Sequence, residues 1–141
     1  MKQLKNTCLL ALGLLLSQAC SAQVAVVVGA QSSATALTTE QASALFLGKS
    51  DQLAGVGAVV LLDQPESVAV REQFYTKVTG KSAAQVKAAW ARLVFSGKAA
   101  LPKEVGSSAE VKKMLGSNPK AIGYIEKSAV DASVKVLLTV D

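Results

Sequence analysis

Apolar and polar positions follow two different periods along this chain, and together they predict intermixed strands and helices. Continuous apolar runs that are rich in β-branched residues and bounded by turn residues are typical of buried strands. Such runs predict strands at Gln23–Gly29, Ala58–Leu62, Ala121–Ile125 and Val134–Val140. A turn or a single helical turn is expected at Ser128–Ala132.

Helices are predicted where apolar residues recur at helical spacing after a capping residue. Three serine or threonine residues precede a glutamine or glutamate by three positions, the spacing of a capping box. A glycine follows each of these patterns, as is typical of a helix end. The expected helices cover residues 38–47, about 67–78, 82–96 and 107–115.

The order of these elements predicts one α/β domain over residues 23–141. Strands and helices are intermixed along the chain, without an internal repeat or a linker. This arrangement favours a sandwich of two or three layers, in which helices flank a mixed sheet.

The first 22 residues have the features of a secretory signal peptide. Lys2 and Lys5 form a positive start, residues 9–16 are a short apolar core, and Cys20–Ala22 is a small-residue cleavage site. We expect cleavage before Gln23 and a periplasmic location. An uncleaved anchor or a buried helix is one alternative, and a lipid anchor at Cys20 is another. After processing of the signal peptide, only lipidation would attach the domain to a membrane.

Charge limits the classes of partner. The chain carries a net charge of +5, and Lys2 and Lys5 contribute two of these charges. No run of basic residues is interleaved with aromatic residues, so nucleic acid is not an expected partner. The mild positive excess supports at most a weak attraction to anions.

Groups that commonly carry catalysis are scarce. The chain has no histidine, and both cysteines, Cys8 and Cys20, lie in the predicted signal peptide. No phosphate-cradling glycine loop or nucleophile elbow is present. We therefore expect no enzyme, no metal and no cofactor, although serine chemistry with an unusual base stays open.

The turn Asp63–Ser67 is the best candidate for binding, because it joins a predicted strand to a helix N-terminus. Free amide groups and the positive end of the helix dipole favour an anion at such a turn. Arg71 could reach back to the anion, and Ser67 could donate its hydroxyl group. Alternatively, Arg71 faces water and pairs with Glu66, while Ser67 caps the helix or lies in its first turn.

Two further features are weaker candidates. Ser32 and Ser33 form a second polar spot, which could equally be a plain loop. Trp90 could be a platform for a ligand, but its position in an apolar helical stripe favours a core tryptophan.

The order of several motifs resembles that of phosphate-binding proteins from phosphate ABC transporters. The segment Thr39–Lys49, TEQASALFLGK, resembles their LEQLxxIFLGK helix, and Arg71–Phe74 resembles their TRExF helix. Ser107–Val111 followed by Asn118–Ile125 resembles their SSxEVxxxVxxxPGAIGYV ending. The resemblance spans nearly all of residues 23–141 and implies one lobe of a periplasmic-binding-protein fold. It also implies phosphate or another small oxyanion as ligand, with Arg71, Ser67 and the backbone amide groups near Val68 as donors.

This chain departs from the family pattern in two ways. The family closes two lobes on phosphate, whereas this chain resembles one lobe. The family's binding turn reads R-x-x-G-S-G-T-R, and only its last arginine matches, at Arg71. Gln64 stands at the first arginine position, and Ser67 and Ala69 stand at the two glycine positions. Val68 and Val70 stand at the serine and threonine positions. Glu66 adds a negative charge at the helix start, which would repel phosphate.

Two functional hypotheses follow from these departures. One is a solute-binding-like protein associated with phosphate uptake, in which ligand binding is weak or lost. The other is a non-catalytic interaction module, because an open lobe leaves a surface for a protein partner or for self-association.

Overall fold

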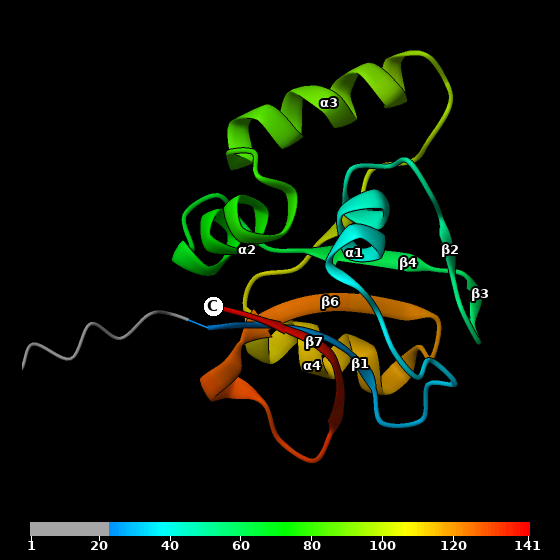
Figure 1. Cartoon of the computed structure of the whole chain (residues 1–141), viewed down its shortest axis with the longest axis vertical. Coiled ribbons are helices and arrows are strands. Elements are labelled where there is room, and N and C mark those ends of the chain that lie inside the picture. Colours follow the sequence, from blue (N-terminus) through cyan, green and yellow to red (C-terminus); the bar gives the residue numbers. More distant parts are fainter. Residues whose placement is uncertain (1–22) are drawn as a thin grey trace, which may run out of the picture.

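The computed structural model describes residues 23–141, so the predicted signal peptide and the lipidation alternative at Cys20 lie outside the described residues. Strands and helices are intermixed along this part of the chain (Figure 1). No helix among the described residues is long and apolar enough to span a membrane. The elements are, in order, β1 (Val24–Gly29), α1 (Thr39–Phe46), β2 (Gln52–Leu53), β3 (Gly57–Ala58), β4 (Val60–Asp63), α2 (Ala69–Thr79), α3 (Ala83–Phe95), β5 (Lys103–Glu104), α4 (Ser108–Ser117), β6 (Ala121–Glu126), the 3-10 turn η1 (Lys127–Ala129) and β7 (Val134–Val140).

Five strands form one mixed sheet in the order β5-β4-β6-β1-β7. Strand β1 runs antiparallel to both β6 and β7, whereas β4 runs parallel to both β6 and β5. Strands β2 and β3 form a separate two-stranded hairpin. The parallel pairs place the carboxyl ends of β4 and β5 at the same edge, where α/β proteins commonly bind ligands.

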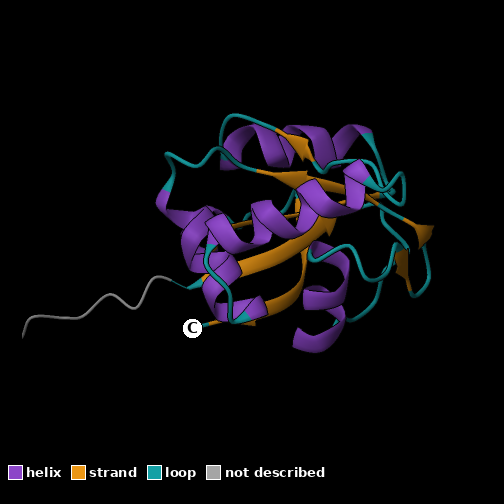
Figure 2. Ribbon diagram, turned by 90° about the horizontal axis from the view of Figure 1, so that it is seen from above, coloured by secondary structure: helices purple, strands orange, loops and turns teal. Residues whose placement is uncertain are grey.

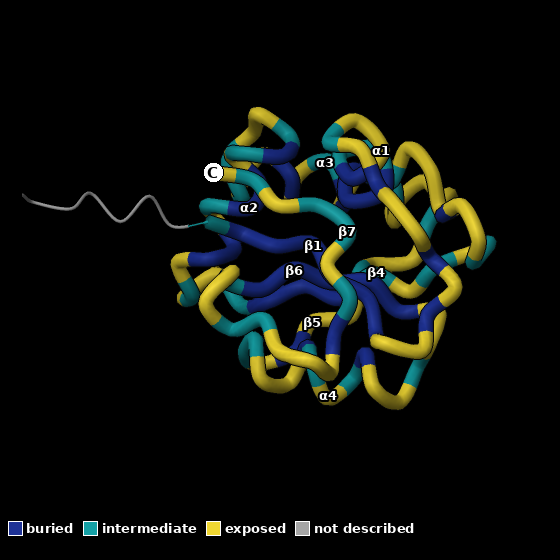
Figure 3. Tube along the Cα trace, turned by 60° about the horizontal axis from the view of Figure 1, so that its bottom comes forward, coloured by how far each residue is buried: buried dark blue, intermediate teal, exposed yellow. Residues whose placement is uncertain are grey.

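The sheet has a hydrophobic core on each face, as expected for strands whose side chains alternate. Val24, Val26 and Val28 of β1 contact the cluster formed with α1, α2 and α3, whereas Ala25 and Val27 contact the cluster formed with α4. Figure 2 shows helices on both sides of the strands, and Figure 3 shows β1 and β6 buried between them. The fold is therefore a three-layer α/β sandwich with a mixed sheet flanked by helices, as the sequence predicts.

The capping patterns largely form as predicted. Thr38 and Ser82 each complete a capping box with the glutamine three residues later. Ser107 accepts a hydrogen bond from the Glu110 amide, but the Glu110 carboxylate accepts one from Gly106 rather than from Ser107.

The predictions around the second strand were less accurate. The expected strand at Ala58–Leu62 is divided into β3 and β4, and β4 extends to Asp63. The expected loops on either side contain the short strands β2 and β5. Two-residue strands carry too few alternating positions to produce a periodic signal, so their pairing depends on the rest of the fold.

One helix lies outside the others. Figure 1 shows α3 beyond α2, away from the sheet. Of the apolar stripe expected on this helix, only Val86 and Trp90 are buried, whereas Val94 is exposed. The C-terminal half of α3 and the loop after it therefore border open surface.

Candidate anion-binding site

The turn after β4 is fixed by a buried glutamine. Gln64 is 1% exposed, and its side-chain amide donates hydrogen bonds to the Tyr124 carbonyl at 2.8 Å and to Ser108 Oγ at 3.2 Å. These bonds connect the end of β4 to β6 and to the start of α4. The turn is thus held from both sides before α2 begins.

Asp63 is the acceptor of a buried network at this turn. Its carboxylate accepts hydrogen bonds from the Tyr75 hydroxyl group at 2.8 Å, from the Tyr124 hydroxyl group and from the Gln64 amide. Burial, and then the charge of Asp63, raise the pKa of Tyr75 and that of Tyr124 above the ordinary tyrosine range. Both hydroxyl groups therefore stay protonated and keep donating.

Arg71 belongs to the same network. Its Nη1 donates to the Gln64 carbonyl at 3.1 Å, and its Nη2 lies 3.7 Å from a carboxylate oxygen of Asp63. The guanidinium carbon lies 5.7 Å from the centre of the Tyr75 ring. Among the described residues, Nε of Arg71 has no hydrogen-bond partner.

The expectation that Arg71 faces water and pairs with Glu66 was wrong. Arg71 is only 8% exposed, and Asp63 is its ion-pair partner. Glu66 is exposed and pairs with Lys87 at 2.8 Å. This hydrogen bond and the charge of Lys87 lower the pKa of Glu66, and Arg71 contributes little. Helical spacing could not predict this outcome, because Glu66 lies outside the helix.

The start of α2 differs from the expected cap. Val68 is the N-cap residue and provides no side-chain hydrogen bond, so the exposed Ser67 is not the cap. Within residues 23–141, the amide groups of Ala69 and Val70 have no hydrogen-bond acceptor. These are two donors of the kind that an anion at a helix start would use.

A cavity of about 440 Å³ lies beside this turn, and we call it the turn cavity. Ser67 and Arg71 both line it, whereas Val68 does not. Three carboxylates face it against two cationic groups, so its charge is unfavourable for an anion. The lining residues are Asp63, Pro65, Glu66, Ser67, Arg71, Val86, Lys87, Trp90, Leu101, Pro102 and Glu104.

Ser32 and Trp90 have largely structural roles, whereas Ser33 is exposed. Ser32 is buried, and its hydroxyl group accepts a hydrogen bond from the Ala34 amide. Neither Ser32 nor Ser33 lines the turn cavity. Trp90 is 6% exposed and donates to the Phe46 carbonyl at 2.7 Å, as expected for a core tryptophan. The edge of this side chain nevertheless lines the turn cavity.

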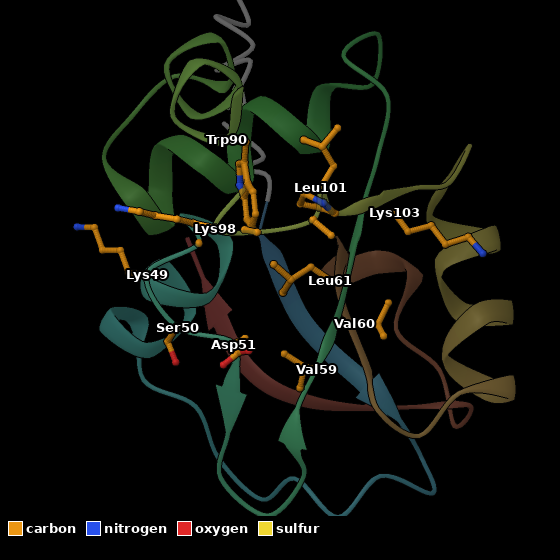
Figure 4. Close-up of a pocket in the computed structure, with 14 residues that line it drawn as sticks. Lys49, Ser50, Asp51, Val59, Val60, Leu61, Trp90, Lys98, Leu101 and Lys103 are labelled. Atoms are coloured by element: carbon orange, nitrogen blue, oxygen red, sulfur yellow. The ribbon is translucent and has the colours of Figure 1, made fainter. Parts of the chain in front are cut away.

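A second cavity, of about 530 Å³, shares a wall with the turn cavity. We call it the lysine cavity, because Lys49, Lys98 and Lys103 line it with Asp51 as the single acidic residue. Figure 4 shows Lys49 and Lys98 on one side of the cavity and Lys103 on the other, with all three side chains extending outward. The remaining lining residues are Gly48, Ser50, Val59, Val60, Leu61, Trp90, Ala99, Ala100, Leu101 and Pro102.

The lysine cavity could not be predicted from the sequence, because its walls come from four separate parts of the chain. Gly48 is the one local signal. It has a positive φ of 74°, and a Cβ atom there would lie 2.4 Å from Leu93 and 3.2 Å from Trp90. Glycine combines this φ with the close approach, which keeps the backbone of Gly48 against the Trp90 ring. No group of three or more potential metal ligands occurs among residues 23–141.

Comparisons with known proteins give structural neighbours only. No family model and no curated protein matches this chain. A phosphate ABC transporter substrate-binding protein with bound phosphate from Clostridium perfringens has a similar structure, with a TM-score of 0.65 and 21% identity. The same holds for an ABC-type phosphate transport receptor from Vibrio cholerae (TM-score 0.63, 23% identity) and for PstS from Borrelia burgdorferi (TM-score 0.59, 15% identity).

The extent of these matches defines what they establish. Each covers 82% of this chain but only 45%, 46% and 47% of the respective neighbour. This chain therefore has the fold of a single lobe of phosphate-binding transport proteins. The expected fold class and the resemblance in fold are confirmed. The roles of Arg71, Ser67 and Val68 in binding stay predictions.

Proposed function

We propose that this protein is a periplasmic, non-catalytic solute-binding-like protein of the phosphate-transport type, in which oxyanion binding at the turn after β4 is weak. The shared fold with phosphate-binding transport proteins supports the general role. The periplasmic location depends on the signal peptide predicted at residues 1–22. Any anion would use Arg71, Ser67 and the amide groups that follow Val68.

We expect weak binding because Arg71 already contacts groups within the protein. Its guanidinium group already contacts the Asp63 carboxylate and the Gln64 carbonyl. An anion would have to compete with a carboxylate that also accepts from two tyrosines. Glu66 and Glu104 line the same cavity, and their negative charges would repel an anion there.

Calorimetric titration with inorganic phosphate at low salt tests this proposal. We expect the wild-type protein to bind with a dissociation constant of about 1 mM or weaker, about 4 kcal/mol of binding free energy. The double variant Glu66→Gln, Glu104→Gln should bind several times more tightly, because two repulsive charges are removed. Arg71→Lys should lose the residual binding, because lysine lacks the forked donor geometry.

Arg92→Lys is the matched control, because Arg92 lies exposed on α3. Micromolar binding by the wild-type protein, unchanged in Arg71→Lys, would contradict both the weak affinity and the assigned donor. Thermal unfolding of each variant separates a loss of binding from a loss of fold.

An interaction module is the second candidate function, and one observation favours it. Phe95 is 97% exposed at the end of α3, and Leu101 is 63% exposed in the following loop. Large apolar side chains so far from the core are typical of contact surfaces when they lie together. Sedimentation velocity would detect self-association, which Phe95→Ser should abolish. A monomer at high micromolar concentration would argue against self-association.

A further inference from the structure

The lysine cavity differs from the turn cavity in having cationic groups without partners. Within the described residues, the ammonium groups of Lys49, Lys98 and Lys103 make no ion pair and no hydrogen bond. Asp51, the one carboxylate in the lining, accepts a hydrogen bond from its neighbour Gln52. The cavity therefore carries an uncompensated positive charge that a ligand could neutralise.

Part of the lining of the lysine cavity is apolar. Val60 is 41% exposed and Leu101 63% exposed, and both are among the few large apolar side chains left open to solvent. The Trp90 ring and Leu61 complete the wall, with Trp90 fixed by its hydrogen bond to Phe46. A volume of about 530 Å³ lies within the range of small-ligand pockets.

The position of the cavity at the sheet edge explains why it is open. Strand β4 pairs with β5 only at Leu62 and Asp63, so β5 does not cover Val60 and Leu61. Residues 98–102 line the same cavity as Val60 and Leu61, and no backbone hydrogen bond joins the two segments among the described residues. An apolar strand edge and three lysines therefore border the same space.

We propose that the lysine cavity binds a small organic anion, namely a carboxylate on an apolar body about the size of a six-membered ring. The apolar body packs against Trp90, Leu61 and Leu101, which removes exposed apolar surface from water. The carboxylate lies at the rim of the cavity on the side of Lys49 and Lys98, whose exposed side chains extend outward there (Figure 4) and are free to turn toward it. Inorganic phosphate has no apolar part, so it cannot use these walls.

Trp90 offers a direct measurement, because it is the single tryptophan of the chain. Its emission is followed while the full-length protein is titrated with cyclohexanecarboxylate, which does not absorb at the excitation wavelength. We expect a saturable change with a submillimolar dissociation constant. Cyclohexylmethanol, which has the same ring but no charge, should bind at least about tenfold more weakly, the ratio for about 1.4 kcal/mol.

Variants assign the signal to this cavity. Lys49→Gln combined with Lys98→Gln should weaken carboxylate binding about tenfold and leave the weak binding of the alcohol unchanged. Lys87→Gln is the matched control, because Lys87 lies on the same helix as Trp90 but lines the turn cavity. That control should bind the carboxylate like the wild-type protein.

Two results would overturn the proposal. One is the absence of saturable carboxylate binding, and the other is equal binding by the Lys49→Gln, Lys98→Gln variant and the wild-type protein. Arg71→Lys separates this site from the proposed phosphate site, because it should affect phosphate and leave the carboxylate unchanged. The two proposals can therefore fail independently.

Discussion

The turn cavity and the lysine cavity lie on either side of Trp90, Leu101 and Pro102, yet their charges are used in opposite ways. At the turn, Arg71 and Asp63 are buried and bonded to each other and to neighbouring groups. In the lysine cavity, the charged groups are exposed and have no ionic partner among residues 23–141. The buried, bonded charges at the turn contribute to folding, whereas the exposed charges of the lysine cavity remain available to a ligand.

The largest expected effect comes from removing the acceptor of the buried network. Asp63→Ala leaves the Arg71 guanidinium group and two tyrosine hydroxyl groups without their acceptor. We expect the free energy of unfolding in urea to fall by about 3 to 5 kcal/mol, the cost of breaking a buried pair. Asp51→Ala, the matched change in the lysine cavity, should alter it by less than about 0.5 kcal/mol. Equal effects of the two variants would remove the contrast between the cavities.

A smaller effect is expected from a single hydroxyl group of the network. Tyr124→Phe keeps the ring, which stacks on Phe74 with the ring centres 4.1 Å apart. It removes one hydrogen bond to Asp63, so the free energy of unfolding should fall by about 1 to 2 kcal/mol. A chemical denaturation curve measures this value. An unchanged midpoint would mean that Asp63 does not depend on this donor.

The ion pair of Asp131 and Lys112 is intermediate between the two cavities. Asp131 is exposed, like the charges of the lysine cavity, but it is bonded to a partner, Lys112, at 2.9 Å. Hydrogen bonds from Ser133 and then from Lys112 lower the pKa of Asp131 to about 2. A lowered folded-state pKa gives stability that is present above about pH 4 and is lost as the pH falls toward 2. The wild-type protein should therefore lose its advantage in melting temperature over Asp131→Asn across this range. If the difference in melting temperature between the two proteins did not change with pH, the protonation of Asp131 would not be coupled to folding.

The smallest effect on stability is expected where the effect on binding is largest. Lys49→Gln with Lys98→Gln removes two exposed charges that make no ion pair within the described part of the chain. The free energy of unfolding should change by less than about 0.5 kcal/mol. A larger loss, measured by urea denaturation, would show that these lysines act in folding and would weaken the distinction between the two cavities.

Local sequence signals predicted the elements well and the site poorly. The capping boxes at Thr38 and Ser82 are formed by residues three positions apart, so a short window contains all the information. The ion-pair partner of Arg71, Asp63, also accepts from Tyr124, which reaches the turn only when β6 pairs with β4. The lysine cavity likewise requires β4 to be an incompletely covered edge, which follows from the two-residue length of β5.

The position of β1 in the sheet also has a consequence for how fast the chain can fold. This strand is the first element described, but its register pairs Val24 with Glu126 on one side and with Val140 on the other. Contacts between such distant parts of a chain slow folding to the millisecond-to-second range, because a long loop must close before they form. Until β6 and β7 have been synthesised, the segment VAVVVG has no partner and can associate with other unfolded chains. Completion of the central sheet therefore requires the last residues of the sequence, and a stalled or truncated chain would be prone to aggregation.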